Sequence, residues 1–238
     1  MKLKFIEKKK EAGDSVSFIF SAKGGSSFGR EPVESISWKA GQFLIYFLPH
    51  EEPDVRGKQR FFTISSAPFE KHVMLTTRIF PENKSSFKKA LEELKPGGLV
   101  DVKGPDGDFI IEDPNKNFVF IAGGIGITPY HSIIKQLNFE QKPLNIELLY
   151  ANKTDEFVFK DELEQISSTN PNFKITYIIS PQHVDQKYIR ENVQDIPSKR
   201  FYVSGPEPMV ESLYEMLKGM GIKEENIKTD YFPGYEAI

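Results

Sequence analysis

The sequence changes its hydrophobic pattern once, at the polar segment EDPNKN, residues 112–117. Before this segment, short stretches rich in β-branched and aromatic residues alternate with turn residues, which is typical of an antiparallel barrel. After it, apolar runs alternate with segments of helical period, which predicts a parallel sheet covered by helices. We therefore predict fold class β plus α/β: an antiparallel six-stranded β-barrel over 1–113 and an α/β domain with a parallel sheet over 114–238.

The predicted elements follow from this pattern. In the first domain, strands are expected at 2–10, 15–22, 42–48, 60–66, 73–80 and 99–104. One helix, in KSSFKKALEELKPGG, carries an apolar stripe of helical spacing made by Phe87, Ala90, Leu91 and Leu94. In the second domain, strands are expected at 118–122, 144–151, 173–179 and 200–204, and helices at 128–137, 160–166, 185–193 and 206–220. The aromatic segment IKTDYFPGY follows the last helix.

Composition excludes several classes of function. The sequence has no cysteine, so it can form no disulfide, thiolate nucleophile, cysteine-ligated zinc site or cysteine-ligated iron–sulfur cluster. Its four histidines show no metal-ligand spacing, and we expect no metal site. A net charge of -3 gives no reason to expect nucleic acid. No apolar run is long enough to span a membrane, and the N-terminal residues lack a signal-peptide core, so we expect a cytoplasmic protein. We also expect a monomer.

Two turns of the second domain resemble each other. In IAGGIGITPYHSII, Gly123, Gly124 and Gly126 follow a buried strand, and Thr128 and Pro129 suit the N-cap and first position of a helix. Glycines there would let a phosphate approach backbone N–H groups at the positive end of a helix dipole. A tight turn needs glycine as well, and Pro129 stands where a G-x-G-x-x-G motif has its third glycine.

The second of these turns, in YVSGPEPMVESL, contains Ser204, Gly205 and Pro206 at the end of the fourth predicted strand. Parallel sheets bind ligands at the carboxyl edge, so two such turns indicate a binding crevice there. A helix cap with a proline start is the alternative.

Two stretches of the first domain also need explanation. The helix near Ser85 and Ser86 has lysines in its first turns and no acid, although cations at a helix N-terminus cost about 0.3–1 kcal/mol each. A bound anion would make these cations favourable, and a solvated lysine face is the alternative. The lysines are Lys84, Lys88 and Lys89. In RFFTISSAP, residues 60–68, a strand mixes apolar and polar residues on both faces and begins with an arginine.

The order of these motifs resembles the ferredoxin–NADP reductase superfamily, in which an FAD-binding β-barrel precedes a Rossmann-like NAD(P)-binding domain. The resemblance extends from AGQFLIYFLP through GPDGDF to the end of the sequence. It implies that RFFT is the family's R-x-Y-[ST] motif, in which Arg60 pairs with the flavin pyrophosphate. Phe62 then replaces the tyrosine that packs on the flavin ring, and Thr63 lies near flavin N5.

The resemblance assigns further residues to cofactor binding. In the barrel these are Phe61, Thr77, Lys84, Ser85 and Ser86, the last three in the second pyrophosphate segment. In the second domain, the NAD(P) pyrophosphate loop comprises Gly123, Gly124, Gly126, Thr128 and Pro129. The nicotinamide segment comprises Ser204, Gly205, Pro206 and Met209, with Ser204 in place of the family's usual cysteine. Phe232 is expected to cover the flavin face, with Tyr235 as second choice.

The implied activity is hydride transfer from NADH or NADPH to FAD, with Thr63, Ser204 and Phe232 as the catalytic set. Electrons would pass to a separate acceptor protein such as a ferredoxin, flavodoxin, cytochrome or oxygenase component. After LLYA there is neither an acid for a ribose hydroxyl nor an arginine for a 2′-phosphate, so the choice of nucleotide stays open. Two alternatives also stay open: a flavin-binding regulatory or electron-transfer subunit of a larger complex, and a protein that binds another phosphate ligand and no flavin.

Overall fold

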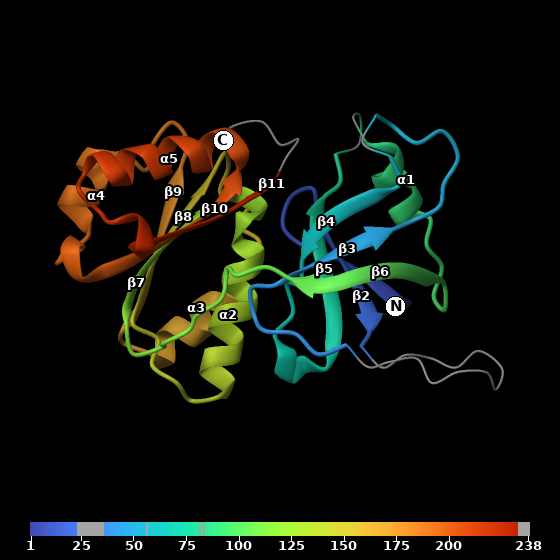
Figure 1. Ribbon diagram of the computed structural model, residues 1–238, viewed down its shortest axis with the longest axis horizontal. Coiled ribbons are helices and arrows are strands. Elements are labelled where there is room, and N and C mark those ends of the chain that lie inside the picture. The colour runs from blue at the N-terminus through green and yellow to red at the C-terminus, as the bar shows by residue number, and fades with distance from the viewer. Residues whose placement is uncertain (23–35, 56, 81, 83, 233–238) are drawn as a thin grey trace. The chain divides into compact units, whose positions relative to one another are not determined.

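The computed structural model describes residues 1–22, 36–55, 57–80, 82 and 84–232 (Figure 1). The chain divides into two compact units, Met1–Ile110 and Ile111–Ile238. The predicted boundary, after residue 113, falls three residues later, inside the polar segment 112–117.

The first unit is a six-stranded antiparallel sheet in the order β4-β3-β6-β1-β2-β5. The strands are β1 (Lys2–Lys10), β2 (Ser15–Ser21), β3 (Phe43–Phe47), β4 (Gln59–Thr63), β5 (His72–Arg78) and β6 (Leu99–Asp106). An antiparallel bridge between Ile64 and Leu75 joins the chain just after β4 to β5, so the two end strands meet and the sheet closes into a barrel.

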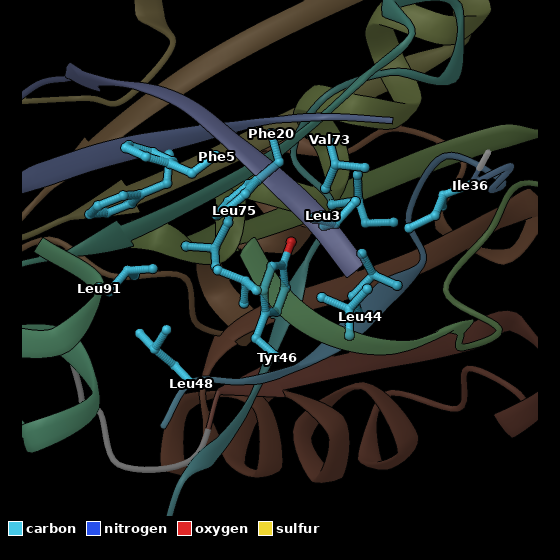
Figure 2. Packing of buried hydrophobic residues seen from close by; sticks show 14 of the residues in the cluster. Leu3, Phe5, Phe20, Ile36, Leu44, Tyr46, Leu48, Val73, Leu75 and Leu91 are labelled. Atoms are coloured by element: carbon cyan, nitrogen blue, oxygen red, sulfur yellow. The ribbon is translucent and has the colours of Figure 1, made fainter. Parts of the chain in front are cut away.

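Alternating side chains build the barrel core. Leu3 and Phe5 of β1 are buried and alternate with exposed residues, and β3 buries Leu44 and Tyr46 in the same alternating way. These residues meet aliphatic and aromatic side chains from β2, β5 and α1 (Ser86–Glu92) in one cluster (Figure 2). The short helix η1 (Pro68–Glu70) lies between β4 and β5.

The second unit has five parallel strands in the order β11-β10-β7-β8-β9. They are β7 (Asn117–Gly123), β8 (Ile146–Asn152), β9 (Phe173–Ile179), β10 (Lys199–Pro206) and β11 (Ile227–Phe232). Helices α2 (Thr128–Phe139) and α3 (Lys160–Thr169) cover one face, and α4 (Gln186–Asn192) and α5 (Glu207–Gly219) cover the other (Figure 1). Short helices η2 (Gly124–Ile127), η3 (Ile196–Ser198) and η4 (Glu224–Asn226) complete the unit.

The predicted fold class is confirmed, with two corrections of detail. Thr128 is not the N-cap of α2, because the 3₁₀ helix η2 runs directly into it and Ile127, with helical dihedrals, precedes the first residue. The segment after α5 forms a fifth parallel strand, β11, which the sequence pattern did not identify. Tyr235 lies outside the described residues. In the part of the chain that the structure describes, no helix is long and apolar enough to cross a membrane.

Candidate functional site

The strand order creates a switch point between β7 and β10. The chain leaves β7 toward β8 on one side, whereas β10 lies on the other side of β7. Ligands of open parallel sheets bind at the carboxyl ends of the strands at such a point. The two turns singled out in the sequence, after β7 and after β10, are therefore neighbours at this edge.

The glycines of these turns let the two segments touch. A Cβ on Gly126 would lie 2.2 Å from the carbonyl oxygen of Ser204 and 2.8 Å from the Cα of Gly205. A Cβ on Gly123 would lie 2.5 Å from the sulfur of Met209, and one on Gly205 would lie 2.6 Å from its methyl carbon. Packing within the unit thus requires glycine at Gly126, where the obstacle is backbone, whereas at Gly123 and Gly205 the tip of Met209 would have to move; it brings these predicted residues together with Met209.

The start of η2 supplies the donors for an anion. Thr128 donates its N–H to the carbonyl of Ile125, so the helical run begins at Gly124 and not at the threonine. The first N–H groups of a helical run have no partner within it, and here they belong to the glycine turn. Gly124 itself adopts φ 54°, in the left-handed region that glycine tolerates best. Backbone donors with no side chain beside them suit a phosphate.

Ser204 is fully buried beside an acid that the sequence analysis missed. Its Oγ lies 3.5 Å from Oδ2 of Asp230, at the limit of a hydrogen bond, because the β10–β11 register pairs these two residues. Tyr130 donates its hydroxyl to the carbonyl of Tyr202 at 2.7 Å, and burial together with the charge of Asp230 raises its pKa. The sequence signal for Asp230 was its place in a strand paired with β10, and it could be used only once β11 was recognised. Phe232 ends β11 opposite Pro206 and is partly exposed.

In the barrel, β4 presents its two phenylalanines differently. Phe61 is 53% exposed and lies 5.7 Å, ring to ring, from Phe43. Phe62 is partly buried and packs edge-on against Tyr46 at 5.7 Å and near Phe87 at 6.0 Å. Both aromatic faces predicted for a flavin are therefore held in place by neighbouring rings.

The guanidinium of Arg60 is bound by groups of its own unit. Its NH2 group donates to both carboxylate oxygens of Asp54, at 2.6 and 2.8 Å. Its NH1 group donates to the carbonyls of Gly57 at 3.0 Å and Gln59 at 2.7 Å. The guanidinium carbon also lies 5.3 Å from the centre of the Phe87 ring.

The hydroxyls at the start of α1 also have partners. Ser85 is the N-cap and accepts the N–H of Lys88 at 3.2 Å. The Oγ of Ser86 accepts the N–H of Asp54 at 2.9 Å and lies 3.0 Å from Nε2 of His50. The serines therefore stabilise the helix start and the segment 48–55, which joins β3 toward β4.

The remaining predicted barrel residues lie around this group. Thr63 and Thr77 are buried, at the ends of β4 and β5. Two of the three lysines have partners, since Lys84 pairs with Glu92 at 2.8 Å and Lys88 donates to the carbonyl of Arg78 at 2.7 Å. Lys89 is exposed. The predicted residues thus form two groups, one in each unit.

The residue types of both groups fit a flavin dinucleotide and a nicotinamide dinucleotide. The glycine turn offers backbone donors where a Cβ would obstruct, and the barrel offers a partly buried cation beside aromatic rings. The one obstacle is the carboxylate of Asp54 on Arg60. Among the residues that the structure describes, no three acidic or histidine side chains are arranged to hold a metal ion.

Comparison with known proteins agrees with this geometry. Residues 120–215 match the family "Oxidoreductase NAD-binding domain". The F subunit of the Na(+)-translocating NADH-quinone reductase of Klebsiella pneumoniae is 30% identical over 224 residues, which cover 83% of this chain and 53% of that protein. Its Neisseria meningitidis counterpart is 30% identical over 227 residues and matches 83% of this chain and 54% of that protein. The chain thus spans about half the length of these relatives.

Solved structures share the fold over nearly the whole chain. The FAD/NAD binding domain of nitric oxide dioxygenase from Vibrio cholerae has a TM-score of 0.79 at 19% identity and covers 97% of this chain, which covers 98% of it. Ferredoxin-NADP+ reductase from Plasmodium falciparum has a TM-score of 0.78 at 19% identity, with 97% and 95% covered. The chain therefore contains an oxidoreductase NAD-binding domain at 120–215 and has, over nearly its whole length, the fold of ferredoxin-NADP+ reductase. The fold that the resemblance of its motifs implied is thereby confirmed.

Proposed function

We propose that this chain is a flavin-dependent NAD(P)H oxidoreductase that accepts a hydride from NADH or NADPH on FAD and passes electrons to a separate acceptor protein. The observation that carries the proposal is the pairing of an oxidoreductase NAD-binding domain at 120–215 with a closed barrel whose strand β4 reads Arg-Phe-Phe-Thr. The two cofactors supply the redox chemistry, transferring a hydride from nicotinamide C4 to flavin N5. The side chains are then left to bind, orient and exclude water.

On this proposal the barrel holds the flavin. Arg60 binds the pyrophosphate, with Ser85 and Ser86 close by at the start of α1. Phe62 packs on the ring and Thr63 lies near N5, where its hydroxyl orients the reacting atom. Burial of Thr63 at 4% exposure supports this role, because a buried hydroxyl has few alternative partners and little freedom.

The second unit holds the nicotinamide dinucleotide. The N–H groups of the glycine turn bind its pyrophosphate, and Ser204, beside Gly205 and Pro206, orients the nicotinamide. Asp230 supports Ser204 by accepting its hydroxyl, which fixes the serine rotamer. Phe232, at the end of the neighbouring strand, covers the flavin until the nicotinamide replaces it.

A second candidate function is a flavin-containing component of a larger electron-transfer complex. The name of the Klebsiella pneumoniae relative, the F subunit of an NADH-quinone reductase, favours it, because this chain matches about half of that protein. In such a complex the acceptor would be another component or domain, and free NAD(P)H would reduce external dyes slowly.

Visible absorption spectra of the purified protein test both candidates. We expect flavin bands that bleach on anaerobic addition of NADH or NADPH, and the nucleotide that bleaches them at lower concentration is the donor. Bands that bleach while dye reduction stays slow would favour the component of a complex. A colourless protein that does not take up added FAD would refute both.

A further inference from the structure

Asp54 contacts two of the barrel residues that we assign to the flavin pyrophosphate, Arg60 and Ser86. Its carboxylate accepts two hydrogen bonds from Arg60, at 2.6 and 2.8 Å, and its own N–H donates to Oγ of Ser86 at 2.9 Å. One acidic residue therefore engages the cation and the hydroxyl at once. No pattern in the sequence had drawn attention to it.

The ion pair between Arg60 and Asp54 is largely shielded from solvent. The side chain of Arg60 is 12% exposed and that of Asp54 is 27% exposed. A partly buried guanidinium needs an anionic partner, and carboxylate and phosphate satisfy the same forked arrangement of N–H groups. On NH2, a phosphate oxygen would need the position that the Asp54 carboxylate holds.

The segment 48–55 holds Asp54 in this position. His50 bonds the carbonyl of Leu48 at 2.7 Å through Nδ1 and lies 3.0 Å from Ser86 Oγ through Nε2. The His50 ring also meets Phe87 edge-on, with centroids 6.1 Å apart. The segment is thus anchored on α1, and its carboxylate is fixed on Arg60.

We propose that Asp54 is an internal anion that occupies the pyrophosphate position on Arg60 and leaves it when the flavin dinucleotide binds. The proposal rests on the proposed function and adds a specificity-determining residue to the flavin site. It makes flavin binding an exchange of one anion for another, so the carboxylate of Asp54 lowers the affinity for FAD. A flavin without phosphate makes no such exchange and is unaffected.

The test is the dissociation constant of FAD for the full chain stripped of flavin, measured by quenching of flavin fluorescence. We expect Asp54→Asn to bind FAD about 10-fold more tightly than the wild type, because one charge-assisted pair no longer has to be broken. Glu51→Gln is the matched control: it removes one exposed carboxylate from the same segment and should leave the constant unchanged. Riboflavin, which has no phosphate, should bind both variants as it binds the wild type.

Each other outcome has a definite meaning. Weaker or unchanged FAD binding in Asp54→Asn would overturn the proposal, weaker binding by making Asp54 a residue that positions Arg60 for the phosphate. Tighter binding in Glu51→Gln as well would overturn it in favour of a general charge effect. If neither the wild type nor Asp54→Asn binds FAD, the proposed function itself fails. Binding by the variant alone would support both.

A crystal structure of the wild-type chain with FAD gives a second test of the proposal that needs no variant. We expect Asp54 to lie beyond hydrogen-bond distance of Arg60 and a phosphate oxygen to take its place on the guanidinium. A bidentate Arg60–Asp54 pair that persists beside bound FAD would overturn the proposal even if the flavin site is as proposed.

Discussion

Replacing Gly126 by alanine should destabilise the α/β unit more than any other methyl group added to its glycine turns. The new Cβ would lie 2.2 Å from the oxygen and 2.5 Å from the carbon of the Ser204 carbonyl, and 2.8 Å from the Cα of Gly205. All three are backbone atoms, so no side-chain rotation can make room. The end of β10 or the start of η2 would have to move.

The cost can be estimated by comparison with two other glycines. Overpacking costs about 1–3 kcal/mol, and a backbone obstacle places Gly126→Ala near 3 kcal/mol. The nearest atoms at Gly123 are the flexible tip of Met209, so Gly123→Ala should cost about 1 kcal/mol. At Gly219, at the end of α5, no atom lies within 4 Å of the new Cβ, and alanine should add up to about 0.5 kcal/mol by its helix preference.

Urea unfolding of the three variants measures this order. Circular dichroism at 222 nm follows the helices, most of which lie in the α/β unit, whereas fluorescence of Trp38, the only tryptophan in the sequence, follows the barrel. We expect Gly126→Ala to shift the transition seen by circular dichroism strongly, to a lower urea concentration. Unfolding within about 0.5 kcal/mol of the wild type, or a larger loss in Gly123→Ala, would refute the packing argument.

Four further substitutions test the barrel and the helix contacts. Tyr46→Phe should leave the free energy of unfolding unchanged or raise it by about 1 kcal/mol, because the buried hydroxyl has no partner among the described residues; a loss above about 1 kcal/mol in urea unfolding would contradict this. Glu162→Gln should lower stability at neutral pH, because hydrogen bonds with His131 and then Lys135 hold the carboxylate pKa below its ordinary value of 4.5. The difference from wild type should be full above pH 4.5 and shrink as the pH falls toward the lowered pKa, so a pH-independent difference would refute it. Phe62→Ala should weaken FAD binding and cost about 2 kcal/mol of stability, whereas Phe61→Ala should cost less than about 0.5 kcal/mol; equal losses in unfolding would contradict the burial of Phe62.

Hydrophobic periodicity predicted the fold well because it reports burial directly. Short β-rich stretches between turn residues, such as 2–10 and 42–48, predicted the barrel strands, and the unbroken apolar run at 118–122 predicted the central parallel strand. Periodicity failed for β11, whose edge position leaves most of its residues partly or fully exposed. It also could not show that η2 would displace Thr128 from the cap, since a 3₁₀ turn of glycine and isoleucine has no capping side chain to mark it.

The glycine turns show why motifs alone could not decide the function of a site. Gly126 packs against the backbone of β10, and Gly123 and Gly205 pack against the tip of Met209, whatever binds at the edge. A sequence in which they serve only a tight turn would look the same. The match of 120–215 to an oxidoreductase NAD-binding domain is what distinguishes the two interpretations.

At Arg60, by contrast, the sequence motif identified the residue but not Asp54, its partner in the structure. The side chain of Arg60 lies over Phe87 and is only 12% exposed, so its buried charge needs an anionic partner. Before a flavin binds, Asp54 supplies that anion from a segment without any periodic pattern. The Arg60–Asp54 pair therefore neutralises the buried charge in the folded barrel. On our proposal, its carboxylate also competes with the flavin phosphate for Arg60. A chain that folds before it binds FAD needs this neutralised charge, and the affinity for FAD then depends on how strongly the carboxylate competes.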